Sequence, residues 1–162
     1  MERELRDQLL RLLENNSKLS SQDLAVMLGA TVEEVANEIS VLEQEHVICG
    51  YHTLIDWNKI NDDVTALVEL RVTPQGGDGY QKLAERIKEF PQVVTLYLMS
   101  GAYDFLVMVK GKTLKEISLF VSGKLASIHE VQNTTTHFTL TKYKEFGVDF
   151  EVEKVDERMV VT

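Results

Sequence analysis

The amino-acid sequence has little cysteine and no long apolar run. Its only cysteine, Cys49, cannot form a disulfide within the chain, and no pattern of a secretory leader follows Met1. We therefore expect a reducing compartment and a cytoplasmic protein. Charged residues or glycine interrupt every strand-like stretch well before the ~20 apolar residues that a membrane helix needs, so we expect no membrane partner.

Sequence motifs of catalysis are missing as well. Serine, histidine and acidic residues occur without a nucleophile elbow or a paired-carboxylate pattern, so we expect neither an enzyme nor a cofactor. The glycine-rich stretch 76–79 lacks the Gly-x-Gly-x-x-Gly spacing of a phosphate loop and predicts a flexible loop. His46, Cys49 and His52 have a zinc-like spacing, but on a strand Cys49 would point away from the two histidines, so we expect no metal site.

An excess of positive charge is also absent. The formal net charge is −9, and residues 1–60 hold five basic side chains against eleven acidic ones. Phosphate groups repel such a chain unless its basic residues gather on one face, so the composition counts against a nucleic-acid partner. What the chain does contain is apolar material. Of its 162 residues, 44% are hydrophobic, enough for one ordinary core or two small ones.

Two helices are predicted near the start of the sequence. Leucines recur at helical spacing over residues 2–14, and a stretch that favours turns follows. Ser20 or Ser21 can cap a second helix, which Gly29 ends. The buried stripe that we expect on this second helix consists of Leu24, Ala25, Met27 and Leu28.

A third helix and a wing are predicted before residue 60. Thr31 can cap the helix, which ends near His46. Its apolar face comprises Val32, Val35, Ala36, Ile39 and Leu42. Two helices joined by a glycine turn make the helix-turn-helix pattern, and the stretches 47–52 and 53–55 are typical of short strands that pack on it as a wing. We therefore expect a winged helix-turn-helix domain with a linker strand over residues 1–60.

The remaining sequence alternates strand and helix patterns. In chain order the strand, helix, strand, strand, helix and strand patterns cover residues 63–73, 80–87, 93–99, 103–109, 114–128 and 131–142. This order predicts a ferredoxin-like βαββαβ domain over residues 61–145, with an antiparallel sheet and both helices on one face. The chain as a whole is then α+β. Residues 146–162 predict a charged, strand-like tail able to cross to a partner.

The predicted strand 103–109 is apolar on both sides. Phe105, Val107 and Val109 alternate with Leu106 and Met108, so each face of this strand needs burial. The two predicted helices cover only one face of the sheet. A second subunit can cover the other face, and we therefore expect a homodimer.

The fused order of the two predicted domains resembles the Lrp/AsnC family, the feast/famine regulators, across about residues 1–145. In the first half the resemblance lies in Leu19-Ser20, Asp23-Leu24-Ala25, Leu28-Gly29, Thr31, Val35, Ile39, Leu42-Glu43 and Val47-Ile48-x-Gly50-Tyr51. In the second half it lies in Gly101-x-x-Asp104 and in Val131-x-x-Thr134-Thr135-Thr136 before Leu140. Together these motifs are fairly specific, although each alone is common.

The resemblance implies a transcriptional regulator that binds double-stranded promoter DNA and senses a small effector, expected to be an amino acid. It also implies dimers that assemble to octamers. The DNA-binding residues that we expect are Arg11, Lys18, Ser20, Thr31, Asn37, Ser40 and Gln44. The effector-binding residues that we expect are Gly101, Tyr103, Asp104, Thr134 and Thr136. Asp104 would pair with an ammonium group, and the threonine hydroxyls would hold a carboxylate.

The predicted third helix departs from the family pattern. It carries no lysine or arginine, and Glu38 stands where the family usually has an arginine. Its acidic residues are Glu33, Glu34, Glu38, Glu43 and Glu45. A carboxylate repels phosphate, and in the major groove the base contact that suits it is with the amino group of cytosine. This charge favours an alternative, in which the protein is an effector-binding or protein-interaction module whose helix-turn-helix no longer reads DNA.

Overall fold

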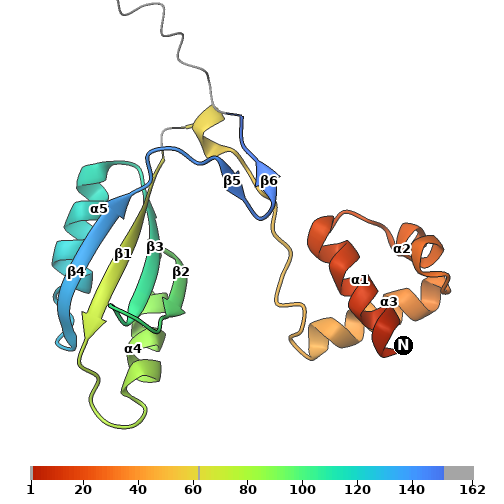
Figure 1. The fold of residues 1–162 in the computed structure, drawn as a ribbon, viewed down its shortest axis with the longest axis horizontal. Helices are drawn as coiled ribbons and strands as arrows, with labels where there is room; N and C mark the ends of the chain where they lie inside the picture. Colours follow the sequence, from red (N-terminus) through yellow and green to blue (C-terminus); the bar gives the residue numbers. More distant parts are fainter. Residues whose placement is uncertain (1, 62, 152–162) are drawn as a thin grey trace, which may run out of the picture. The chain divides into compact units, whose positions relative to one another are not determined.

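The computed structural model describes residues 2–61 and 63–151, and the chain divides into two units between Ile55 and Asp56. Three helices make up the first unit: α1 (Arg3–Asn15), α2 (Ser21–Leu28) and α3 (Val32–Gln44) (Figure 1). They confirm the three helices predicted from the sequence. The helices that the structure describes in either unit are all too short or too polar to cross a bilayer.

Short-range hydrogen bonds fix where α2 and α3 begin and where α2 ends. Ser20 caps α2 and Thr31 caps α3, each in a capping box with the acidic residue three positions on, Asp23 and Glu34. These bonds lower the pKa of both carboxyls, in Asp23 chiefly through the Ser20 hydroxyl and in Glu34 chiefly through the Thr31 amide. Gly29 ends α2 with a φ of 64°, a conformation that favours glycine.

The core of the first unit is one apolar cluster between the three helices. Its buried members are Leu9, Leu13, Leu24, Ala25, Leu28, Val35 and Leu42. Two predicted stripes need correction. Met27 is 58% exposed, because it projects to the side of the stripe that the other three α2 residues form. On α3, Val32 and Ala36 are exposed, because the packed side of this helix is rotated towards Glu38, which is buried.

The segment after α3 does not form the predicted wing. Residues 47–55 are neither strand nor helix in the structure. His46 leaves the helix with a φ of 55°, and the amides of Val47 and Ile48 donate to the Leu42 carbonyl at 2.9 and 3.1 Å. These amides are therefore not available to a ladder, and a strand needs a neighbouring strand to pair with. The prediction of a wing and a linker strand is wrong for this segment.

The second unit contains the predicted βαββαβ order. Its main elements are β1 (Val64–Val72), α4 (Gly79–Lys88), β2 (Val93–Leu98), β3 (Phe105–Gly111), α5 (Leu114–Phe120) and β4 (Val131–Phe138). A π-helical turn, Val121–Leu125, continues α5. The strands form one antiparallel sheet in the order β2-β3-β1-β4 (Figure 1). This arrangement confirms the predicted α+β fold with an antiparallel sheet.

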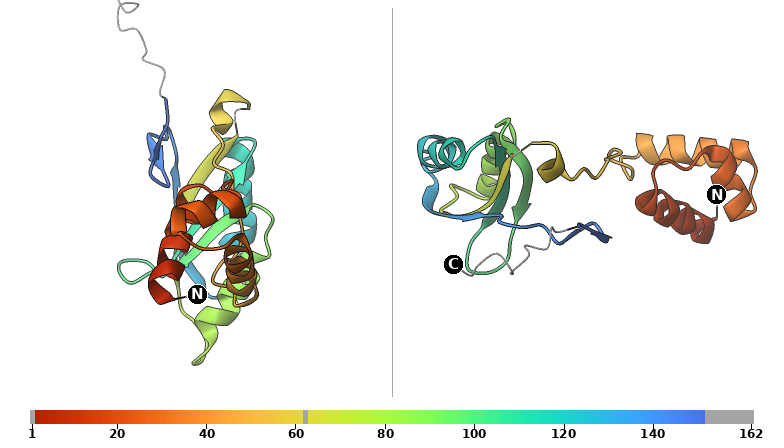
Figure 2. Two further views of the ribbon diagram at one scale, coloured as in Figure 1. Left: turned by 90° about the vertical axis from the view of Figure 1, so that its right-hand side faces the viewer. Right: turned by 90° about the horizontal axis from the view of Figure 1, so that it is seen from above.

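The two faces of the sheet differ in what covers them. Both helices pack on one face (Figure 2), where they bury Ala66, Val68, Leu70, Val72, Phe105, Val107 and Val109. Side chains alternate along a strand, so the residues between these lie on the opposite face. This open face carries Leu67, Glu69 and Arg71 of β1, Leu106 and Met108 of β3, and Asn133, Thr135 and His137 of β4. These side chains are half-buried or exposed.

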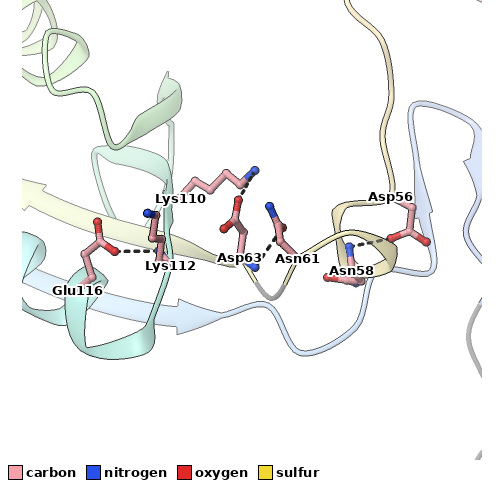
Figure 3. Close-up of polar contacts among 7 residues, drawn as sticks. All are labelled: Asp56, Asn58, Asn61, Asp63, Lys110, Lys112 and Glu116. Carbon is pink, nitrogen blue, oxygen red and sulfur yellow. Dashed lines mark hydrogen bonds and ion pairs between the residues drawn. The ribbon is translucent and has the colours of Figure 1, made fainter.

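Polar contacts hold the turn that precedes β1 (Figure 3). Trp57–Lys59 is a single 3-10 turn, and the carboxylate of Asp56 accepts from the Asn58 amide at 3.2 Å. Lys110 of β3 pairs with Asp63 at 2.9 Å and lies 4.2 Å from the centre of the Trp57 ring. Lys110 therefore holds the segment before β1 against β3, and Lys59 of the turn also pairs with Glu151 at 2.9 Å.

The chain after β4 forms a small hairpin. β5 (Lys144–Glu145) and β6 (Val148–Asp149) pair antiparallel around Phe146 and Gly147, which both have positive φ. Phe146 is 83% exposed. Residues 152–162, the greater part of the predicted tail, lie outside the described residues.

Candidate functional site

Arg6 of α1 pairs with two glutamates, Glu38 of α3 and Glu45 immediately after α3. Its Nε lies 3.0 Å from the carboxylate of Glu38, and its terminal nitrogen contacts the carboxylate of Glu45. The Glu38 side chain is 11% exposed, so Arg6 supplies a positive charge where an unpaired carboxylate would be costly. Glu38 therefore lies on the packed side of α3, away from the solvent-exposed side.

Two further glutamates of α3 are held by hydrogen bonds. Glu34 accepts from the amide and the hydroxyl of Thr31, at 2.8 and 2.9 Å. Glu43 accepts from the Tyr51 hydroxyl at 2.8 Å, and the pKa of this tyrosine is raised, chiefly by burial and then by the bond to Glu43. Glu33 is the remaining glutamate of the helix. It is exposed and makes no hydrogen bond or ion pair within residues 2–61 and 63–151.

One exposed stripe remains on α3, and it is mostly uncharged. Glu33, Asn37, Ser40 and Gln44 are all exposed and follow each other at intervals of four, three and four, which places them on one side of a helix. Within the stripe, the Gln44 amide donates to the Ser40 hydroxyl at 3.2 Å. The amides and the hydroxyl can both donate and accept, which suits contacts with base edges.

The other predicted DNA-binding residues have two kinds of environment. The hydroxyls of Ser20 and Thr31 act as helix caps, so they hold the first turns of α2 and α3 in place. Arg11 and Lys18 are exposed, and their side chains have no partner in the described part of the chain. Two cations are thus available to phosphate outside α3.

A second candidate site lies on the open face of the sheet. It is a shallow concavity of about 120 Å³ beside the turn between β2 and β3. It is lined by Glu69, Arg71, Ala102, Tyr103, Asn133 and Thr135. Arg71 donates to the Ala102 carbonyl at 2.6 Å, and Glu69 lies 3.1 Å from a ring nitrogen of His137. Charges of both signs therefore line one small space.

Asp104 holds the turn beside this concavity. Its carboxylate accepts from the Val72 amide at 2.8 Å and from the Tyr80 hydroxyl at 3.1 Å. The hydrogen bond to Asp104 is the main reason why the pKa of Tyr80 is raised. Gly101 lies in this turn with a φ of 150°, a conformation that favours glycine. Both carboxylate oxygens of Asp104 are thus engaged within the unit.

The structure places the predicted threonines on the other face of the sheet. Thr134 and Thr136 pair in register with Leu70 and Val68, which face the helices. Tyr103 is the predicted effector residue that lines the concavity. The sequence analysis did not predict the other lining residues, which are Asn133 and Thr135 of β4 and Glu69 and Arg71 of β1. The alternation of β1 carries the missing signal, since it already assigns Glu69 and Arg71 to the side away from the core.

The comparisons with known proteins point to one family. The sequence model described as "Lrp/AsnC ligand binding domain" matches residues 65–148. An HTH-type transcriptional regulator of Bacillus subtilis, YugG, is 42% identical over 157 residues, covering 96% of this chain and 95% of the relative.

Solved structures of similar fold point to the same family. An AsnC family transcriptional regulator from Agrobacterium tumefaciens is 29% identical, with a TM-score of 0.71 over 94% of this chain and 96% of that protein. A transcriptional regulator of Neisseria meningitidis, solved in complex with L-Met, has a TM-score of 0.73 at 19% identity, over 94% of this chain and 97% of that one. At 19% identity, the comparison with the Neisseria meningitidis protein shows a shared fold and no more.

Proposed function

The chain belongs to the Lrp/AsnC family of transcriptional regulators, and on that premise we propose that it binds promoter DNA through α2 and α3 and responds to a small effector through its second unit. It acts on double-stranded DNA in the cytoplasm and has no catalytic role. One observation carries the proposal: the exposed stripe of α3 presents Asn37, Ser40 and Gln44, while Glu38 is turned inward to Arg6.

The first unit supplies a helix-turn-helix. α2, the turn at Gly29 and α3 have its order, and in this motif the second helix enters the major groove. The amides of Asn37 and Gln44 can each donate and accept, which matches the N6 and N7 atoms of adenine. Arg11 and Lys18 supply phosphate contacts, which fix position without reading sequence.

Fluorescence anisotropy on the protein's own promoter region tests this role. A good bidentate base contact contributes enough that Asn37→Ala and Gln44→Ala should each weaken binding by about 5- to 150-fold. Gln81→Ala is the matched control, because Gln81 is an exposed amide on α4 of the second unit. If the wild-type chain binds no DNA even at low salt, the alternative holds and the acidic helix serves as a protein-interaction module.

The second unit supplies the effector site. Arg71 suits the carboxylate of an amino acid and Glu69 its ammonium group, while Tyr103, Asn133 and Thr135 add hydrogen-bonding groups. The L-Met complex of the Neisseria meningitidis protein supports an amino acid as the ligand class. Leu106 and Met108 on the open face are apolar and only half-buried, which supports a homodimer that covers them and can assemble further to an octamer.

Isothermal titration with the twenty amino acids tests the effector site. At least one should give heat with the wild-type protein, and Arg71→Gln should abolish it. Lys124→Gln is the control, because Lys124 is an exposed cation outside the concavity. Absence of heat with all twenty would sink the proposed amino-acid effector. Light scattering of the same samples tests assembly, since a monomer contradicts the proposed dimer.

A further inference from the structure

We propose that Glu33 determines a base preference of this protein by accepting a hydrogen bond from the amino group of a cytosine in the major groove. The inference rests on the proposed DNA binding through α3. It concerns the one residue of the exposed α3 stripe that carries a charge.

The position of Glu33 on the helix suits contact with a base edge. Glu33 is the second residue of α3 and lies in its first turn. The N-terminal residues of a recognition helix are the ones that contact base edges in helix-turn-helix proteins. Asn37 follows one turn later on the same exposed side. A contact by Asn37 therefore brings Glu33 to the neighbouring part of the same groove.

The carboxylate of Glu33 is available in a way that the other three on α3, and that of Glu45 just after it, are not. Glu34 bonds to Thr31, Glu43 to Tyr51, and both Glu38 and Glu45 contact Arg6. Within the described ranges Glu33 has no such partner. A free carboxylate offers only acceptors, so its preference among the bases follows from where donors lie in the groove.

Cytosine is the base that matches a lone carboxylate. Its N4 amino group is a donor in the major groove, whereas guanine and thymine present acceptors at O6, N7 and O4. Adenine places the N7 acceptor beside its N6 donor, so it matches an amide better than a carboxylate. A carboxylate opposite an acceptor is repelled and loses its water. Glu33 therefore acts as much by rejecting other bases as by binding cytosine.

The rest of α3 adds no basic side chain that would contribute a preference for guanine. No lysine or arginine occurs between Val32 and Gln44, so this helix cannot make the common bidentate contact with guanine. The remaining readers on the stripe, Asn37 and Gln44, suit adenine. The expected half-site is therefore a cytosine close to adenines on the strand that α3 reads.

Selection from a pool of randomised duplexes tests the role of Glu33 in the full-length protein. Sites selected by the wild-type chain should share a cytosine in each half-site. Glu33→Gln should replace that cytosine with adenine, because glutamine can bond to both N6 and N7. Exchanging this cytosine for adenine in a selected site should weaken wild-type binding by about 5- to 150-fold and should favour Glu33→Gln.

Glu89→Gln is the matched control, since Glu89 is an exposed glutamate of the second unit and its loss changes the net charge equally. It should keep the cytosine. The inference is overturned if Glu33→Gln selects the same sites as the wild type. It is also overturned if that variant binds all sequences more tightly without a new preference, because Glu33 then only repels phosphate. The DNA-binding proposal fails separately, if the wild-type chain binds no duplex even at low salt.

Discussion

The two units of the chain use their charged residues in opposite ways. In the first unit, Arg6 pairs with Glu38, whose side chain is withdrawn from the surface that α3 presents. In the second unit, Glu69 and Arg71 lie close together on β1 and line the same concavity with charges of both signs. The net charge of a segment therefore does not predict its binding chemistry, because the direction of each side chain decides what a ligand meets.

This difference suits two kinds of ligand. Neutral amides and hydroxyls on α3 match the mixed donors and acceptors of base edges, and an added charge there restricts which base is accepted. Paired charges in a small concavity match a zwitterion, whose two ends have opposite charge.

Removing Arg6 should destabilise the first unit. Arg6→Ala removes the ion pair that balances the charge of buried Glu38, and we expect a loss of about 2 to 3 kcal/mol in the stability of this unit. The expected loss is below the ~3–5 kcal/mol of a fully buried pair, because about a third of the Arg6 side chain is exposed. Hydrogen exchange of the α1 and α3 amides measures it.

A neighbouring arginine gives the control for that experiment. Arg3 is exposed at the start of α1, and Arg3→Ala should change stability by less than about 0.5 kcal/mol. The double variant Arg6→Ala with Glu38→Gln should recover part of the loss, because no buried charge then remains. Equal stability of the two arginine variants would show that Arg6 does not hold Glu38.

Removing Asp104 should destabilise the second unit, because its carboxylate bonds to Val72 of β1 and Tyr80 of α4. Asp104→Ala leaves the amide of buried Val72 without an acceptor, and we expect a loss of about 2 kcal/mol in the second unit. Tyr80→Phe removes one hydrogen bond to the same carboxylate and should cost less, about 0.5 to 1 kcal/mol. Fluorescence of Trp57 during urea unfolding reports on this unit. Equal losses in the two variants would contradict the ranking.

The cap of α3 gives a smaller effect with a defined pH dependence. Thr31→Ala should cost about 1 kcal/mol in the first unit. The pKa of Glu34 is lowered below its ordinary value of 4.5 by the bonds to Thr31. The stabilisation that accompanies this shift is therefore complete above pH 4.5 and is lost as the pH falls through the lowered pKa.

NMR titration of the side-chain carboxyls measures this prediction directly. In Thr31→Ala the pKa of Glu34 should rise only part of the way to 4.5, because the amide of residue 31, the larger cause of the shift, remains. The pKa of Asp23 at the α2 cap should stay lowered. Asp23 is the internal control because Ser20, not Thr31, supplies its hydrogen bonds. A pKa of Glu34 that the substitution leaves unchanged would exclude the Thr31 hydroxyl as a cause of the shift.

The smallest effect concerns the cations outside α3. If Arg11 and Lys18 contact phosphate, replacing either by glutamine should weaken DNA binding on all sequences alike. Each change should reduce the slope of log affinity against log salt by about 1. Lys124→Gln, in the second unit, should leave the slope unchanged. Unaltered slopes in all three variants would place the phosphate contacts elsewhere.

Local signals made much of the fold predictable. The caps at Ser20 and Thr31, the glycine at position 29 and the alternation of β1 each act within a few residues, and the structure has the helices and strands that they indicate. The prediction of a wing was wrong because a strand depends on a partner strand distant in the sequence. The amides after α3 bond instead to the Leu42 carbonyl. A pattern of β-forming residues does not show which partner is present.

The site was predictable only where neighbours along the chain decide it. Helical spacing alone places Asn37, Ser40 and Gln44 on one side of α3. The direction of Glu38 depends on Arg6, which lies on another helix and gives no signal in the α3 sequence. The face on which Thr134 and Thr136 lie depends on the register of β4 against β1, which the threonine run does not encode.

Disulfide cross-linking to DNA tests whether the exposed stripe of α3 lies in the major groove. The full-length protein with Cys49→Ser and Ser40→Cys is mixed with a promoter duplex that carries a thiol tether on a major-groove base edge. The same experiment with Ser118→Cys, an exposed position on α5, is the control. We predict rapid cross-linking from position 40 and none from position 118. A duplex that is bound but never cross-linked from position 40 would contradict the account.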